Sequence, residues 1–217
     1  MREKDGYVPA LRYRWLTKFY DPIIAVTTRE KTFKNKLIEI ADIGPGDKVL
    51  DIGCGTGTLA IRTKMVEPDA NITGIDGDPE VLELAKRKAR DENLEIGFDQ
   101  GLSFSLPYQD DHFDRCLSSL FFHHLTIENK LITFREIYRV LKTGGQCHIA
   151  DWGKPANPLM RLLFYQIQLL DGFTTTRDNV EGRIPSLMQA AHFSDVREVA
   201  QFSTMFGTMT LYNACKS

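Results

Sequence analysis

Three glycines at alternate positions follow a short apolar segment, and they mark the part of this sequence best suited to chemistry. Residues 49–52 (VLDI) lead directly into residues 53–57 (GCGTG). A ligand can approach the backbone closely where Cβ atoms are absent, and open α/β sheets bind ligands at the carboxyl ends of their strands. A tight strand-to-helix turn without a ligand would need one glycine, so three predict a ligand-binding loop.

A carboxylate at the end of the next apolar segment indicates what this loop binds. Asp76, followed by Gly77, closes that segment, where it can accept hydrogen bonds from both ribose hydroxyls of an adenosine. A dinucleotide site needs G-x-G-x-x-G with a pyrophosphate at a helix N-terminus. Here the spacing is G-x-G-x-G, and Asp51 precedes it. An acid there suits a cationic ligand, so the pattern favours S-adenosylmethionine (SAM) over NAD.

Two adjacent histidines are the candidate catalytic groups. His123 and His124 follow the apolar run 113–122 and are expected just beyond a strand, over the cofactor. Histidine titrates near neutral pH and suits a general base, which is needed if the methyl acceptor loses its proton early. The alternative is that one histidine packs in the core or caps the next helix. The cysteines show no zinc-site spacing, and no metal site is expected.

The elements that must position these residues alternate between strand and helix. Apolar segments predict strands over 48–52, 71–75, 94–98, 113–122 and 146–150. Helices are predicted over about 58–65, from Pro79 after an N-capping Asp78, and over 127–142, which is clearly amphipathic and stopped by Gly144-Gly145. This alternation predicts an α/β fold with a parallel sheet and right-handed crossovers.

The two ends of the chain depart from this alternation. A helix over 187–192 precedes strands at about 196–202 and 205–214, and the turn between those strands is too short for a crossover, so they must be antiparallel. An aromatic stretch (11–20) and a helix (29–41) precede the sheet. Without a repeat or linker, residues 1–217 are interpreted as one domain, with an N-terminal helical cap (1–43), a Rossmann-like core (44–217) and a lid segment (about 153–185).

The composition is that of an ordinary globular domain. Of 217 residues, 42% are hydrophobic and 26% charged, with a net charge of −2, which argues against disordered and fibrous classes. The basic excess of a nucleic-acid binder is missing, and no apolar run reaches the roughly 18 residues of a membrane-spanning helix. The charged N-terminus lacks a following apolar segment, and Cys116 and Cys147 lie in apolar runs as expected for core thiols, so a cytoplasmic location is expected.

Several motifs in series resemble those of class I SAM-dependent methyltransferases, most closely the UbiE-like group, over about residues 20–216. They are residues 51–57 (DIGCGTG), 106–108 (LPY), 113–114 (FD), 122–125 (FHHL) and 139–145 (RVLKTGG). The resemblance implies a Rossmann-like, seven-stranded, mostly parallel sheet of order 3-2-1-4-5-7-6, with strand 7 antiparallel and helices on both faces. It also implies SAM as cofactor, contacted by Tyr20, Asp51, Gly53, Cys54, Gly55, Thr56, Gly57, Asp76, Gly77, Leu102, Ser103 and Ser119.

The resemblance also assigns roles within that set. The glycines and Thr56 would line the methionine and ribose portions, Ser119 would contact the methionine part, and Tyr20 would approach the cofactor. Leu102–Ser103 would cup the adenine edge. Many relatives carry an acid or Asn where this chain has Leu102, and losing that hydrogen bond costs about 0.5–1.5 kcal/mol unless Asp99 replaces it.

The sequence therefore predicts methyl transfer to a small-molecule or lipid-like acceptor, with quinone and phospholipid types included. Apolar residues within 159–173 favour a hydrophobic acceptor, and Asp151-Trp152 is a candidate contact with it. The same apolar surface leaves open a peripheral membrane contact or a homodimer. Residues 120–123 (LFFH) differ from the Asn/Asp-Pro-Pro-Tyr/Phe motif frequent in nucleic-acid methyltransferases, so no nucleic-acid partner is expected. A SAM-binding protein without transferase activity and an NAD-linked oxidoreductase remain as alternatives.

Overall fold

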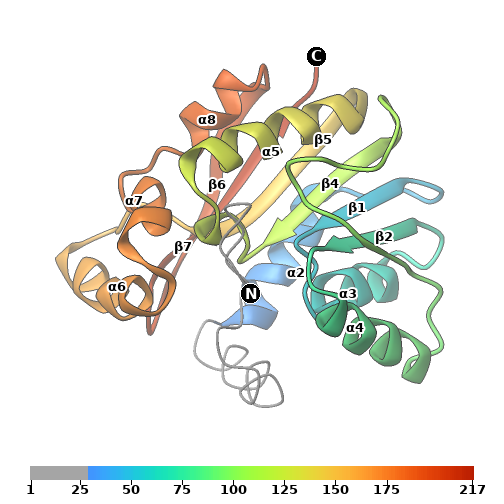
Figure 1. Ribbon diagram of the computed structural model, residues 1–217, viewed down its shortest axis with the longest axis horizontal. Coiled ribbons are helices and arrows are strands. Elements are labelled where there is room, and N and C mark those ends of the chain that lie inside the picture. Colours follow the sequence, from blue (N-terminus) through green and yellow to red (C-terminus); the bar gives the residue numbers. More distant parts are fainter. Residues whose placement is uncertain (1–28) are drawn as a thin grey trace.

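The computed structural model describes residues 29–217, which form a seven-stranded sheet flanked by helices (Figure 1). The strand order is β3-β2-β1-β4-β5-β7-β6, and β7 runs antiparallel to both β5 and β6 while the other pairings are parallel. The predicted fold and strand order are therefore confirmed. The strands are β1 (Lys48–Ile52), β2 (Asn71–Asp76), β3 (Gly97–Gln100), β4 (Phe113–Ser119), β5 (Leu141–Trp152), β6 (Ser194–Thr204) and β7 (Gly207–Cys215).

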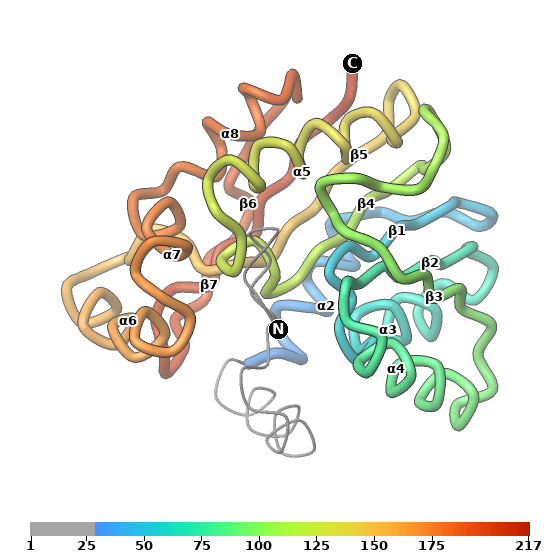
Figure 2. Tube along the Cα trace, viewed as in Figure 1, coloured from blue at the N-terminus to red at the C-terminus, as the bar shows by residue number. Residues whose placement is uncertain are grey.

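Helices cover both faces of the sheet (Figure 2), and a separate hydrophobic core is buried on each side. On one side α2 (Glu30–Ala41) and α3 (Thr58–Val66) pack over Val49 and Ile72, and α4 (Pro79–Asp91) packs beside α3. On the other side α5 (Ile127–Val140) and α8 (Ile184–Ala190) pack over Leu50 and Ile52. Neighbouring residues of β1 thus face opposite cores, which fixes the direction of the loop that follows.

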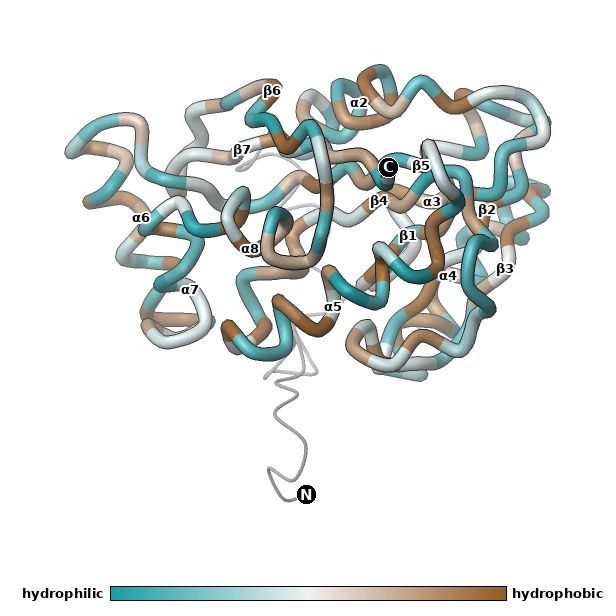
Figure 3. Tube along the Cα trace, turned by 90° about the horizontal axis from the view of Figure 1, so that it is seen from above, coloured by the Kyte–Doolittle hydropathy of each residue, from teal (hydrophilic) through white to brown (hydrophobic). Residues whose placement is uncertain are grey.

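Local sequence signals explain where the helices beside the site begin. The Asp78 carboxylate accepts a hydrogen bond from the Glu80 N–H at the start of α4, and Pro79 occupies the first helical position. The Thr126 hydroxyl accepts from the Asn129 N–H at the start of α5. Figure 3 shows hydrophilic and hydrophobic residues alternating along α5, whose apolar face buries Phe134 and Ile137 completely.

Several predicted element bounds differ from the observed ones. The strand predicted over 94–98 is β3 at Gly97–Gln100, because the Leu94 N–H still bonds to Ala89 O at the end of α4. The strand predicted over 113–122 ends at Ser119, because Leu120 adopts a left-handed φ of 56° and turns the chain. The 3₁₀ helix η2 (Phe122–His124) follows.

Two helices also differ from their predicted bounds. The helix predicted over 127–142 ends at Val140, and β5 starts at Leu141, before the glycine pair at 144–145 that was expected to stop the helix. Leu141 enters the sheet early because it pairs with Phe113 at a bulge in the β4–β5 ladder. The helix predicted over 187–192 is α8, displaced toward the N-terminus.

The segment predicted as a lid contains two helices, α6 (Pro158–Asp171) and α7 (Phe173–Val180), which project beyond the sheet on the left of Figure 1. The buried side chains of α6 pack toward β7, and its outer face exposes apolar side chains, among them Leu162 (63%), Leu169 (74%) and Leu170 (72%). Within residues 29–217, no helix is long and apolar enough to cross a bilayer. The aromatic stretch 11–20, with Tyr20, lies outside the described residues.

Candidate active site

The glycine loop joins the carboxyl end of β1 to α3 and is tied to the end of β2. The backbone N–H groups of Gly53 and Cys54 both donate to Ile75 O, at 2.9 and 3.1 Å. Gly53 and Gly55 adopt left-handed φ values of 65° and 52°, which favour glycine. A Cβ on Gly53 would lie 2.2 Å from the ring of Phe121, whereas one on Gly55 would meet nothing within 4 Å. The loop is therefore packed by protein at Gly53 and open to a ligand at Gly55.

The carboxylate of Asp76 stands directly against this loop. One oxygen accepts from the Gly55 N–H at 2.9 Å, and the other accepts from the Asp78 N–H at 3.0 Å. Burial raises the pKa of Asp76 although these N–H groups act in the opposite direction. Because the side chain remains partly exposed, the carboxylate has a free edge for a ligand bound over Gly55.

Asp51 lies beneath the loop rather than on its surface. The side chain is 1% exposed, and its carboxylate accepts from the Ala60 N–H of α3 at 3.1 Å. Burial raises the pKa of Asp51 to about 7, because it outweighs the lowering by Lys34 and by that N–H. The Asp51 carboxyl is thus poised to ionise near neutral pH, where a cation bound above the loop would favour its charged form.

The remaining predicted loop residues take up different positions. The sulfur of Cys54 packs toward Gly74, so this residue offers a ligand only its backbone. The hydroxyl of Thr56 at the rim accepts from the Lys88 ammonium at 2.9 Å, and Gly57 precedes α3 as its N-cap. Ser119 is the last residue of β4, next to Ser118, which pairs with Ile52 at the end of β1.

The segment predicted to contact the adenine edge lies at the end of β2. Its polar side chains bond to other protein groups. The Gly101 N–H donates to Asp76 O at 3.0 Å, which joins the residue before Leu102 to the end of β2. The Ser103 hydroxyl is buried and bonds to the Thr133 hydroxyl of α5 at 2.9 Å, so the structure does not bring it to the loop. Asp99 accepts from the Tyr108 hydroxyl at 2.9 Å.

The two histidines lie just beyond β4 in a buried cluster with carboxylates. The His123 Nδ1 is 2.7 Å from Asp151 Oδ1, at the end of β5, and the His123 N–H donates to the other oxygen at 3.2 Å. The His123 Nε2 is 3.6 Å from Asp171 Oδ2, and the His124 Nδ1 is 4.0 Å from Asp171 Oδ1. Both imidazoles are less than 10% exposed.

The charges around these histidines shift their pKa values in opposite directions. Burial lowers the pKa of His123, but Asp151 and Asp171 reverse this and leave it raised. Burial, His123 and Lys130 together hold the pKa of His124 well below its usual range. His124 is therefore neutral at physiological pH, whereas the two carboxylates favour the protonated form of His123.

The sequence pattern pointed to the two histidines and to Asp151 but gave no sign of Asp171. Asp171 is the last residue of α6, one position before Gly172, and no motif distinguishes it from other helix-end acids. Lys130, fully buried in α5, likewise has no sequence pattern that marks it as part of the site. Its ammonium donates to Thr175 O at 2.6 Å and to the Asp178 carboxylate at 3.3 Å, which anchors α7 beside the histidines.

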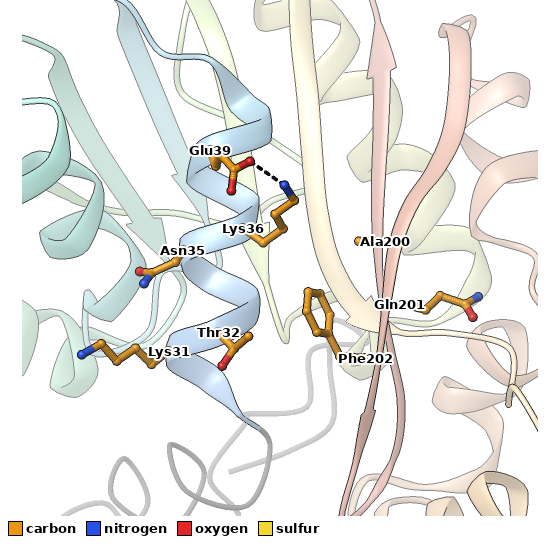
Figure 4. Close-up of a pocket in the computed structure, with 8 residues that line it drawn as sticks. All are labelled: Lys31, Thr32, Asn35, Lys36, Glu39, Ala200, Gln201 and Phe202. Carbon is orange, nitrogen blue, oxygen red and sulfur yellow. Dashed lines mark hydrogen bonds and ion pairs between the residues drawn. The ribbon is translucent and has the colours of Figure 1, made fainter.

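A separate open groove of about 740 Å³ lies between α2 and β6, away from these residues (Figure 4). Its lining contains the Lys36–Glu39 ion pair and Phe202. No residue from the glycine loop, the end of β2 or η2 contributes to it. Within residues 29–217, the candidate binding and catalytic side chains therefore lie at the carboxyl ends of β1, β2, β4 and β5.

Part of the chain is similar to known methyltransferases. A methyltransferase domain matches residues 49–145. The chain is 36% identical over 133 residues to demethylmenaquinone methyltransferase from Lactobacillus johnsonii, which covers 60% of this chain and 54% of that protein. It is 32% identical over 142 residues to 2-phytyl-1,4-naphtoquinone methyltransferase from Synechococcus elongatus, which covers 64% of this chain and 60% of that protein.

Comparison with solved structures supports the same fold. A putative methyltransferase from Bacillus halodurans C-125 matches with a TM-score of 0.71 at 20% identity, covering 84% of this chain and 98% of that one. The fold, the glycine loop and the domain match are similar to those of class I SAM-dependent methyltransferases. The domain match covers less than half of the chain, and the chain spans only 54% and 60% of the length of the two curated relatives.

Proposed function

We propose that the chain transfers the methyl group of SAM to a hydrophobic small-molecule acceptor of the quinone type. The observation that carries this proposal is the open backbone at Gly55 with the Asp76 carboxylate 2.9 Å from its N–H. This arrangement suits an adenosine whose ribose hydroxyls donate to Asp76. When bound, SAM supplies an activated methyl group on a positively charged sulfur.

The acceptor class is supported by two independent features. The curated relatives named above are methyltransferases of demethylmenaquinone and of 2-phytyl-1,4-naphthoquinone. The outer face of α6 exposes several leucines, and a surface of this kind suits contact with a lipid-like molecule or with the membrane that holds it. We place His123 and His124 on the acceptor side of the site, because they lie beyond β4, whereas Asp76 ends β2.

A labelling experiment tests this function. The protein is incubated with methyl-labelled SAM and, separately, with a reduced prenylated naphthoquinone, a phospholipid extract and a pool of polar metabolites. We expect label in the quinol fraction and release of S-adenosylhomocysteine. If SAM binds by calorimetry but no pool acquires label, the chain is a SAM-binding protein without transferase activity. If NAD binds in place of SAM, the adenosyl assignment itself is wrong.

The raised pKa of Asp51 predicts a pH-dependent affinity for SAM. The folded pKa of about 7 lies above the ordinary value of 3.8, so the free protein carries a proton on Asp51 below pH 7 and loses it above. The cationic cofactor favours the ionised form of Asp51 over the protonated form. The affinity for SAM should therefore rise between pH 6 and pH 8, by at most about tenfold per pH unit. Lys34 and Asp76 also act on this carboxyl and are unchanged in the test.

Calorimetric titration with SAM at pH 6 and pH 8 measures this dependence. The Asp51→Asn variant should show a flatter profile, since its side chain does not titrate. The Asp69→Asn variant is a suitable control, because Asp69 is an exposed acid at the opposite end of β2. An affinity that changes equally with pH in the wild type and in Asp51→Asn would show that another group is responsible.

A further inference from the structure

We infer that His123, His124 and Asp171 form a binding site for a divalent transition-metal ion. One ligand atom from each residue lies within 4.8 Å of the other two. The measured separations from Asp171 are 3.6 Å to His123 Nε2 and 4.0 Å to His124 Nδ1. Ligand atoms around a zinc ion at 2.0–2.2 Å lie roughly 3.3–3.6 Å apart in a tetrahedron, so small side-chain adjustments close the site.

The residue types fit such an ion. Two imidazoles and one carboxylate are a ligand set that binds divalent zinc, iron and cobalt while leaving coordination positions open. The three residues come from η2 and from the end of α6, and α7 packs against both elements. Because α6 supplies the third ligand, the ion would also fasten this helix against the rest of the site.

A second carboxylate orients the first histidine as in known metal sites. Asp151 Oδ1 lies 2.7 Å from His123 Nδ1, which fixes the ring and directs Nε2 toward Asp171. Carboxylate partners of this kind commonly support metal-binding histidines and raise their basicity. Asp151 is fully buried and also accepts from the Trp152 and His123 N–H groups, so its position is firmly set.

The charge balance also favours a cation. In the part of the chain that the structure describes, the ion pairs of Asp151 and Asp171 are formed with the two histidines alone. The nearby cations Lys130 and Arg183 pair instead with Asp178, at 3.3 and 3.8 Å. When the imidazoles are neutral, as metal ligands are, two carboxylates lack a fixed counter-charge, and a divalent ion beside Asp171 supplies two positive charges, with Asp151 on the opposite edge of the His123 ring.

The location suggests what the ion would contact. Phe121, two residues before His123, packs its ring against Gly53 of the cofactor loop, so the metal site adjoins the proposed SAM site. An oxygen of the acceptor could occupy an open coordination position, which would orient the acceptor and favour the deprotonated form of a hydroxyl. This role rests on the proposed function, whereas metal binding itself does not.

Cobalt titration tests the site directly, because Co²⁺ replaces zinc and its visible absorption reports coordination by protein ligands. The chelator-treated full chain should bind one equivalent of Co²⁺ with bands in the visible range, and Zn²⁺ should displace it. We expect Asp171→Asn and His124→Gln each to weaken binding by more than about 100-fold, and Asp151→Asn, one step removed from the ion, by about 10–100-fold. The His192→Gln variant, which changes an exposed histidine, should bind as the wild type does.

The outcomes separate this inference from the proposed function. Absence of a cobalt spectrum, or binding that Asp171→Asn and His124→Gln leave unchanged, would overturn the metal site. Calorimetry with SAM checks that each variant is folded. If the chelator-treated, metal-free protein transfers methyl groups at the full rate, the transferase proposal stands and the proposed contact between the ion and the acceptor is wrong. If Co²⁺ binds as expected but SAM does not, the metal site stands and the transferase proposal fails.

Discussion

Replacing both His123 and His124 with glutamine is expected to slow methyl transfer by about 10²–10⁴-fold while SAM affinity stays within about threefold of the wild type. This rate factor is typical of side chains that transfer a proton or orient a reacting oxygen. SAM affinity should persist because both imidazoles lie beyond β4 in contact with Asp151 and Asp171, whereas the proposed adenosine contacts are at Gly55 and Asp76. Single-turnover rates with labelled SAM and calorimetry measure the two quantities.

The matched control is His192→Gln, which should change neither quantity. A thermal unfolding curve for the double variant shows whether the buried cluster tolerates the change. Loss of SAM binding in a variant that remains folded would mean that the histidines support the cofactor loop and do not act on the acceptor. An unchanged turnover would assign them to core packing, the alternative that the sequence left open.

The second large effect is expected at Asp76, where asparagine should weaken SAM binding by about 10–100-fold. A hydrogen bond to a charged group contributes about 1.5–3 kcal/mol, and 1.4 kcal/mol corresponds to a tenfold change in affinity. Asparagine retains one acceptor for the backbone but presents an N–H₂ group in place of the second oxygen. Calorimetry with S-adenosylhomocysteine provides the comparison, and Asp69→Asn serves as the control for the loss of one surface charge.

Because Asp76 also accepts from the Gly55 N–H at 2.9 Å, its replacement could act through the loop. Titration with a 2′-deoxy analogue of S-adenosylhomocysteine distinguishes these routes. If Asp76 binds the ribose, removal of the 2′-hydroxyl weakens binding to the wild type more than to Asp76→Asn. Equal weakening in both proteins would contradict a direct contact and would assign Asp76 to support of the loop.

The fold could be predicted well because its signals are local and repeated. The buried strand before the glycine loop, the Asp78-Pro79 helix start and the apolar periodicity of 127–140 each depend on neighbouring residues. Errors occurred where pairing across the sheet decided the outcome. Leu141 enters β5 by pairing with Phe113, and Leu120 leaves β4 with a left-handed φ while its N–H bonds to Ala150 O.

The candidate site could be predicted only in part, for the same reason. The glycines and Asp76 form a pattern tied to strand ends, and the structure brings Gly55 and Asp76 into contact. Ser103 was expected at the adenine edge, but its hydroxyl bonds to Thr133 on α5, a contact between segments that no local pattern reveals. Asp171 reaches the histidines through the packing of α6 and α7, so its position depends on tertiary structure.

A crystal structure of the chain with S-adenosylhomocysteine would show the proposed SAM site directly. We expect the adenosyl group over the open face of Gly55, with both ribose hydroxyls within hydrogen-bond distance of the Asp76 carboxylate and the amino acid portion toward the end of β4. A crevice without an adenosyl group at saturating ligand, or one that holds a diphosphate in its place, would contradict this expectation.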